Sequence, residues 1–242
     1  MMNRVKCIAS WSGGKDSALA LHLARQRADL EVTGLLTTFS AEFNRVSMHG
    51  VRRALLEAQA DALGLPVTPM LVPTPAADAS CLLCPTAQAP GFTVFPGNDD
   101  YESLLRAALR HAKSEGVEAV VFGDIYLEDL RRYREQRLAE AGMKAIFPLW
   151  GRDPRELAEA VIAAGFKAVV VCVDGARLDG GFAGRAFDAD FLAALPESAD
   201  PCGENGEYHT FVHDGPGFRQ PVQFRIGETV HRPPFWFCDL TP

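Results

Sequence analysis

Ser12-Gly13-Gly14-Lys15-Asp16-Ser17 is the stretch that decides the fold, because it joins an apolar run at residues 5–9 to a helical pattern at residues 16–27. The two glycines let the backbone turn sharply and approach an anion closely. The helix that follows offers free N–H groups and the positive end of its dipole. We therefore predict a phosphate-binding turn between a buried strand and a helix.

The side chains of this turn suit a phosphate group and a metal ion. The hydroxyls of Ser12 and Ser17 can donate to phosphate oxygens, Lys15 supplies positive charge, and Asp16 can hold Mg²⁺ through oxygen. Lys15 and Asp16 are our catalytic candidates, with Mg²⁺ as the expected metal. The spacing excludes the G-x-x-x-x-G-K-S/T loop and the dinucleotide pattern G-x-G-x-x-G. An ordinary glycine turn with an Asp cap is the alternative, but strand, turn and helix fall where a phosphate loop needs them.

Strand and helix patterns alternate along the rest of the first two thirds of the chain, which favours a parallel sheet. An N-cap at Ser47 and a stop at Gly64 bound the second helix. Strands are expected at 5–9, 31–38, 67–72, 119–122, 144–147 and 167–173, and helices at 16–27, 47–63, 99–115, 127–141 and 154–164.

The pattern changes after residue 174. Glycines open a loop, a short helix is expected at 188–195, and the tail is β-rich, with strands expected at 207–212 and 222–226. We predict an α/β fold. A Rossmann-like parallel-sheet domain at 1–147, with a proline-rich loop insertion at 74–98, precedes a smaller C-terminal α+β substrate lobe at 148–242.

Composition limits the classes of function. The formal charge of −7 disfavours a dedicated nucleic-acid binder, which needs a basic face. No segment approaches the roughly 20 apolar residues that span a bilayer, so no membrane partner is expected. The N-terminus has no secretory pattern. We therefore expect a cytoplasmic protein, in which the six cysteines are free thiols by default.

The turn resembles the PP-loop, S-G-G-x-D-S, of ATP pyrophosphatases, which belong to the adenine nucleotide alpha hydrolase-like superfamily (HUP-type fold). Further segments extend the resemblance to the diphthine–ammonia ligase family over most of the chain except residues 75–98. They are Val-Ser-Met-His-Gly-Val at 46–51, Gly-Asp-Ile at 123–125, Arg-Arg-Tyr-Arg at 131–134, Pro-Leu-Trp at 148–150 and Pro-Cys-Gly-Glu-Asn-Gly-Glu-Tyr-His-Thr at 201–210.

The resemblance implies a chemistry. Members of that family adenylate the carboxylate of diphthine, a modified histidine of translation elongation factor 2, and ammonia then displaces AMP. It thus implies an ATP-dependent amide-forming ligase that releases AMP and pyrophosphate. Its partners would be ATP, ammonia and a carboxylate substrate, such as a modified protein side chain. We keep a homodimer as a further hypothesis.

The resemblance and the sheet edge together nominate site residues. Besides Ser12, Gly13, Gly14, Lys15, Asp16 and Ser17, the nucleotide-binding candidates are Thr38, His49, Gly123 and Asp124. The substrate-binding candidates are Tyr133, Glu204, Glu207, Tyr208 and Thr210.

Several of these candidates have plainer interpretations. Asp124 can be a helix cap, and His49 a polar residue in a helix's first turn. The arginines of residues 131–137 can form a solvated face paired with interleaved glutamates. Asn205-Gly206 can be a type I′ hairpin turn.

Two departures from the family pattern concern the substrate. Asn205 stands where a glycine is usual, and His209 where a glutamate is usual. An acidic residue would pair with the trimethylammonium group of diphthine. Its loss suggests a relative that acts on a different, smaller carboxylate.

Two other functions stay open. Cys81 and Cys84 form one C-x-x-C pair, which would suit a PP-loop sulfur transferase acting on tRNA. The acidic charge balance counts against that reading, and two plain thiols in an insertion are the simpler interpretation. The second is a module that senses ATP or AMP without turnover.

Overall fold

The protein is described by a computed structural model that covers residues 4–73 and 99–242. The predicted insertion at 74–98, with Cys81 and Cys84, lies outside these residues. No helix in the described ranges is both long and apolar enough to cross a bilayer.

The N-terminal half is built on a mainly parallel sheet. Its parallel strands lie in the order β4-β2-β1-β5-β6, and a short β3 pairs antiparallel with the end of β2. This order confirms the predicted Rossmann-like α/β fold. The strands are β1 (Val5–Ser10), β2 (Leu30–Ser40), β3 (Arg45–Val46), β4 (Val67–Val72), β5 (Ala119–Val121) and β6 (Lys144–Ile146).

Helices cover both faces of this sheet. α1 (Lys15–Gln26) and α2 (Arg53–Leu63) pack on the face that carries Cys7 and Ala9. α3 (Asp99–Ser114) and α4 (Glu128–Glu140) pack on the face that carries Ile8. Successive strand residues point to opposite faces, so one apolar run supplies both cores.

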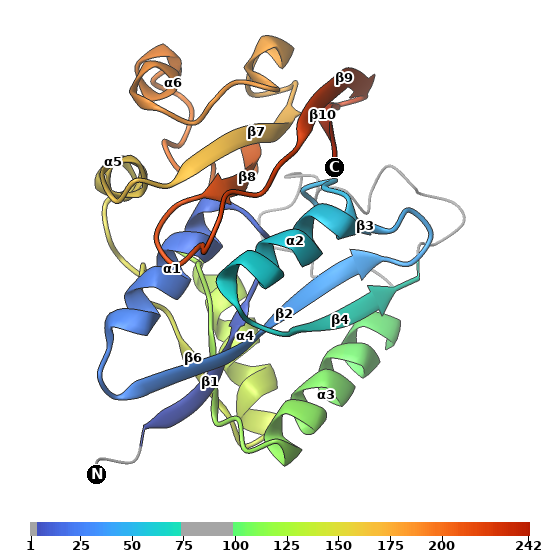
Figure 1. Ribbon diagram of the computed structural model, residues 1–242, viewed down its shortest axis with the longest axis vertical. Coiled ribbons are helices and arrows are strands. Elements are labelled where there is room, and N and C mark those ends of the chain that lie inside the picture. The colour runs from blue at the N-terminus through green and yellow to red at the C-terminus, as the bar shows by residue number, and fades with distance from the viewer. Residues whose placement is uncertain (1–3, 74–98) are drawn as a thin grey trace.

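A second, antiparallel sheet follows in the order β8-β7-β10-β9. Figure 1 shows it above α1 and α2, which lie between the two sheets. Buried residues of β1, α1, β7 and β8 belong to one continuous apolar core. The remaining elements are α5 (Pro154–Ala163), β7 (Lys167–Asp174), η1 (Gly180–Phe182), α6 (Ala189–Ala194), β8 (Tyr208–Asp214), β9 (Arg225–Arg232) and β10 (Phe235–Thr241).

Two local predictions are wrong. Ser47 is not the cap of α2, because that helix begins six residues later, after Arg52. The strand expected at 222–226 is instead β9, beginning at Arg225, and β10 was not foreseen. All eight residues of β9 are exposed, and its large apolar residues, Ile226 and Val230, stand four positions apart, so the sequence shows no apolar alternation there. The division near residue 148 remains our proposal for the lobe boundary.

Candidate active site

The site lies where the order of strands in the first sheet reverses. β1 has β2 on one side and β5 on the other, and ligands of such sheets bind outside the carboxyl ends at this point. A cavity of about 800 Å³ opens there. Its lining includes most of the predicted site residues, namely Ser12, Lys15, Asp16, Ser17, Thr38, His49, Gly123, Asp124, Tyr133, Glu204, Tyr208 and Thr210.

The predicted turn is present between β1 and α1. Gly13 has a φ of +80°, which a side chain would strain. The Ser17 hydroxyl donates to the Gly14 carbonyl at 2.8 Å and lies 3.2 Å from the hydroxyl of Ser12. Both hydroxyls therefore sit at the start of α1, beside the cavity.

Neighbouring side chains crowd both loop glycines. A Cβ on Gly13 would lie 2.7 Å from Oε1 of Gln59, and one on Gly14 would lie 2.8 Å from Cε1 of His49. Neither glycine lines the cavity. The protein groups nearest to these two glycines are therefore the side chains of Gln59 and His49.

Gly123 meets the loop from the other side. A Cβ there would lie 2.9 Å from the carbonyl carbon of Asp16 and 3.0 Å from the amide nitrogen of Ser17. Real Cβ atoms do not come that close to backbone, so glycine lets the end of β5 pass against the first turn of α1. Gly123 shapes the site through this packing.

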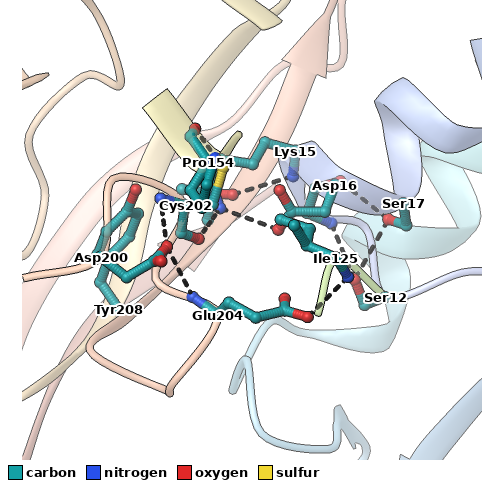
Figure 2. A network of polar contacts seen from close by, with 12 residues as sticks. Ser12, Lys15, Asp16, Ser17, Ile125, Pro154, Asp200, Cys202, Glu204 and Tyr208 are labelled. Atoms are coloured by element: carbon teal, nitrogen blue, oxygen red, sulfur yellow. Dashed lines mark hydrogen bonds and ion pairs between the residues drawn. The ribbon is translucent and has the colours of Figure 1, made fainter. Parts of the chain in front are cut away.

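Lys15 connects the loop to the tail. Its buried Nζ donates to the Cys202 carbonyl, lies 2.9 Å from Oδ2 of Asp16 and sits 5.0 Å from the ring centre of Tyr208. Figure 2 shows the side chain reaching from α1 into this cluster. Burial lowers the pKa of Lys15, but the charge and hydrogen bond of Asp16, together with the interactions of Tyr208 and Cys202, outweigh burial, so the pKa is raised and the ammonium stays charged.

The tail strand β8 runs against the loop backbone. Thr210 Oγ1 accepts from the Lys15 N–H at 3.0 Å, and the Val212 N–H donates to the Gly13 carbonyl at 2.9 Å. Nδ1 of His49 lies 3.1 Å from the Thr210 carbonyl oxygen. Thr210 thus serves the loop as well as the cavity wall.

Glu204 brings a second carboxylate to the cavity, in addition to Asp16. Oε1 of Glu204 accepts from the Ile125 N–H at 2.8 Å, which places this carboxylate beside the end of β5 (Figure 2). Burial and the charge of Asp16 raise the pKa of Glu204 to about 8. Glu204 therefore exchanges a proton near neutral pH, as a general acid or base requires.

Asp124 is held by an ion pair. Its Oδ2 lies 2.8 Å from Nε of Arg134, whose guanidinium stands 4.4 Å from the ring centre of Phe122. The helix-cap interpretation is wrong, because α4 begins at Glu128 and has no side-chain cap. The solvated-face interpretation is also wrong for Arg134, although Arg132 is 72% exposed.

Tyr133 reaches the cavity from α4. Its hydroxyl donates to Oε1 of Glu102 at 2.6 Å, and Arg137 lies 3.4 Å from the other oxygen of the same carboxylate. A contact between α3 and α4 therefore orients Tyr133 where it lines the site.

Glu207 organises the tail turn and does not line the cavity. Its Oε2 accepts from the Asn205 N–H at 3.1 Å and its Oε1 from the Asp200 N–H at 3.3 Å. The type I′ interpretation is wrong, since that turn needs positive φ at both central residues and only Gly206, at +88°, has it. Glu207 therefore supports the loop that presents Glu204.

Two histidines form a neutral wall. The rings of His49 and His209 lie 4.6 Å apart between centres. Burial lowers the pKa of His49 to about 4, and burial and His49 also lower the pKa of His209. Neither ring brings positive charge to the cavity at neutral pH.

The thiols and carboxylates of the described residues decide which nucleophile and which metal ligand the site can offer. Cys7, Cys172, Cys202 and Cys238 are buried, and burial raises the pKa of Cys202, which makes it a poor nucleophile. Among residues 4–73 and 99–242 no group of three or more His, Cys, Asp or Glu could hold a metal ion. Asp16, 28% exposed in the cavity, fits the single carboxylate that Mg²⁺ takes beside phosphate oxygens.

Sequence reasoning missed Gln59 and Asp239. Gln59 is fully buried on α2, and a polar residue among the apolar positions of that helix was the available signal. Asp239 on β10 pairs with Arg45 at 2.8 Å and Arg52 at 2.6 Å, on both sides of the loop that carries His49. No local pattern marks Asp239, because its partners lie almost 200 residues away.

Known proteins resemble this chain over most of its length. Models of the diphthamide synthase N-terminal and C-terminal domains match residues 5–75 and 153–240. Diphthine–ammonia ligase of Danio rerio is 32% identical over 139 residues, 54% of either chain. Those of Bos taurus and Schizosaccharomyces pombe are each 28% identical, covering 54% and 60% of this chain but 51% and 25% of theirs.

Among solved structures, a U34-tRNA thiolase from Methanococcus maripaludis aligns over 66% of this chain and 58% of its own. It does so at 19% identity and a TM-score of 0.37, which is too low for conclusions about function. The curated relatives are longer, and this chain spans about half the length of most of them. The two matched domains nevertheless cover most of the described residues, and the chain belongs to the diphthamide synthase family.

Proposed function

We propose that this chain is an ATP-dependent ligase that joins ammonia to a carboxylate through an acyl-adenylate. One observation carries the proposal: the PP-loop and the tail segment 202–210 line the same cavity. The loop contributes the Asp16 carboxylate to it, and the tail contributes the Glu204 carboxylate. A phosphate loop facing a proton-exchanging carboxylate suits adenylation followed by amine transfer. The names of the curated relatives support the same reaction class.

The phosphate end of the site is assigned to the start of α1. The hydroxyls of Ser12 and Ser17, with the helix N-terminus, would hold the pyrophosphate part of ATP. Thr38 and Gly123, at the ends of β2 and β5, would border the ribose and base. Asp16 would hold Mg²⁺, which supplies charge neutralisation to the phosphates when bound.

The first step makes a poor electrophile reactive. A carboxylate oxygen of the acceptor attacks the α-phosphorus, the bond to pyrophosphate breaks, and an acyl-AMP forms. Lys15, charged and fixed behind the loop, contributes a field that favours the departing pyrophosphate.

The second step needs a neutral amine. Ammonium passes a proton to the Glu204 carboxylate, and the resulting ammonia attacks the acyl carbon. AMP leaves with the electron pair of the broken bond, and the extra proton on the attached nitrogen passes to solvent, which leaves the neutral amide. The pKa of Glu204, raised to about 8, suits this transfer. A carboxylate of ordinary pKa would be a weaker base for ammonium.

We propose a carboxylate related to, but distinct from, diphthine as the acceptor. The side chain of Asn205 donates to Tyr126 at 2.9 Å and Glu207 at 3.2 Å, so it belongs to the loop structure. His209 presents a neutral ring where the resemblance implies a carboxylate. This wall therefore offers no negative charge to a trimethylammonium group. We keep the cytoplasm as the proposed compartment and a homodimer as the proposed assembly.

The test is the product of ATP labelled at the α-phosphate. The chain is incubated with ammonium and either a diphthine-bearing protein or a panel of small carboxylates. We expect labelled AMP only with an acceptor, and loss of AMP in Asp16→Asn but not in the control Asp190→Asn, an exposed residue of α6.

The products of this assay distinguish the ligase from the alternative functions and from the alternative acceptor. ADP as the product, or no AMP with any acceptor, contradicts the ligase and in the second case favours a nucleotide sensor. Efficient amide formation on diphthine contradicts only the altered acceptor.

A further inference from the structure

Gln59 is a buried polar residue whose hydrogen bonds leave its own helix. Its side chain is 0% exposed. Oε1 accepts from the indole N–H of Trp11 at 3.0 Å, while Nε2 donates to the carbonyls of Gly13 at 3.0 Å and Val212 at 2.5 Å. One amide thus joins the end of β1, the PP-loop and the tail strand β8.

The bond to Gly13 determines how the loop presents its amides. The Gly13 carbonyl accepts from both Gln59 and the Val212 N–H, at 3.0 and 2.9 Å. In a trans peptide the N–H points away from the carbonyl. Fixing this carbonyl toward α2 and β8 therefore turns the Gly14 N–H the other way, toward Ser12, whose hydroxyl lies 3.3 Å away beside the cavity.

The contact is also close in space. Gln59 occupies the volume that a Cβ on Gly13 would need, at 2.7 Å from Oε1. A side chain on Gly13 would therefore displace the amide of Gln59 from this position. A side chain of similar size without an amide would fill the space and leave the Gly13 carbonyl with one donor fewer.

We propose that Gln59 is a positioning residue that holds the PP-loop in its phosphate-binding conformation and couples it to β8. The nucleotide end of the site is then competent only when the C-terminal lobe is seated on it. This inference rests on the proposed function, because it concerns how the same loop binds ATP.

The experiment separates positioning from general stability. Gln59→Met keeps the length of the side chain and removes its hydrogen bonds. The matched control is Leu55→Ala, a buried change one turn away on α2 that does not reach the cavity. ATP affinity is measured by calorimetry and stability by urea unfolding. We expect at least a tenfold loss of ATP affinity in Gln59→Met, and less than a twofold loss in Leu55→Ala at comparable destabilisation.

Wild-type affinity in Gln59→Met, or affinity that follows stability alike in both variants, overturns the proposal. If Gln59→Met does not fold, Gln59→Asn replaces it, because it keeps the amide but is one carbon too short, and the same loss is expected. Amide hydrogen exchange at Val212 is the second measurement. We expect faster exchange in the Gln59 variant only, and unchanged exchange overturns the proposal. This measurement does not need ATP. A wild-type protein that binds no ATP would contradict the proposed function and leave the exchange test of Gln59 in force.

Discussion

Glu204→Gln is expected to stabilise the protein at alkaline pH while removing its ligase activity. The folded protein disfavours the charged carboxylate, because Glu204 is buried beside Asp16. Glutamine is neutral and keeps an oxygen that accepts from the Ile125 N–H. Activity is lost because the amide cannot take a proton from ammonium.

The magnitude follows from the two pKa values. The pKa of Glu204 is about 8 in the folded chain, against the ordinary value of 4.5 that we take for the unfolded chain. A raised carboxyl pKa makes stability fall as pH rises between these values, since the unfolded chain ionises first. At about 1.4 kcal/mol for each pH unit, the cost approaches about 5 kcal/mol as an upper bound above pH 8. It is below about 1 kcal/mol near pH 5.

The assay is urea unfolding of wild type and Glu204→Gln at pH 5 and pH 9. The free energy of unfolding of the variant should exceed that of wild type by up to about 5 kcal/mol at pH 9 and by less than about 1 kcal/mol at pH 5. Glu197→Gln, an exposed change in the same tail, is the control and should show no pH-dependent gain. Parallel pH profiles for wild type and Glu204→Gln would refute the assignment of a desolvated, charge-coupled carboxylate.

Two further perturbations probe the frame around the site. Asp239→Asn should lower the free energy of unfolding in urea by about 1–2 kcal/mol, a value kept small because its partners Arg45 and Arg52 are partly exposed. The change should also raise the KM for ATP, because it loosens the loop that carries His49. The hydrogen bond from Arg52 lowers the pKa of Asp239, so this stabilisation is present above pH 3.8 and lost below it; acid unfolding profiles that coincide would contradict the ion pairs. Gly123→Ala should cost about 1–3 kcal/mol and weaken ATP binding in calorimetry, because its Cβ would meet the backbone of Asp16 at 2.9 Å. Unchanged ATP affinity would show that α1 can shift without consequence.

The C-terminal lobe takes part in nucleotide binding under this scheme. Thr210 and Val212 bond to the loop backbone, and Cys202 accepts from Lys15. The PP-loop therefore has its bonding completed by residues about 190 positions later. Removal of the lobe would expose these groups and deprive Lys15 of its acceptor on Cys202.

Local sequence determined the phosphate loop and the order of elements. Strand, glycine turn and helix follow one another within a few residues, so spacing and turn chemistry suffice to predict them. The stops at Gly64 and the start at Pro154 were readable for the same reason, and the structure has Gly64 at a φ of 65° and Pro154 opening α5. The alternation of strands with helices predicted the parallel sheet, because parallel neighbours need a crossover helix between them.

Tertiary structure alone decided which groups meet. Glu204 and Glu207 are three residues apart in one motif, yet one faces the cavity and the other holds backbone amides. Lys15 was predicted to supply positive charge to the loop, and only the fold shows that its Nζ donates to the tail. Gln59 gained its role from Gly13 and Val212, which are 46 and 153 residues away. Short-range spacing specifies conformation within an element, whereas burial, pKa and bonding partners depend on groups that only folding brings together.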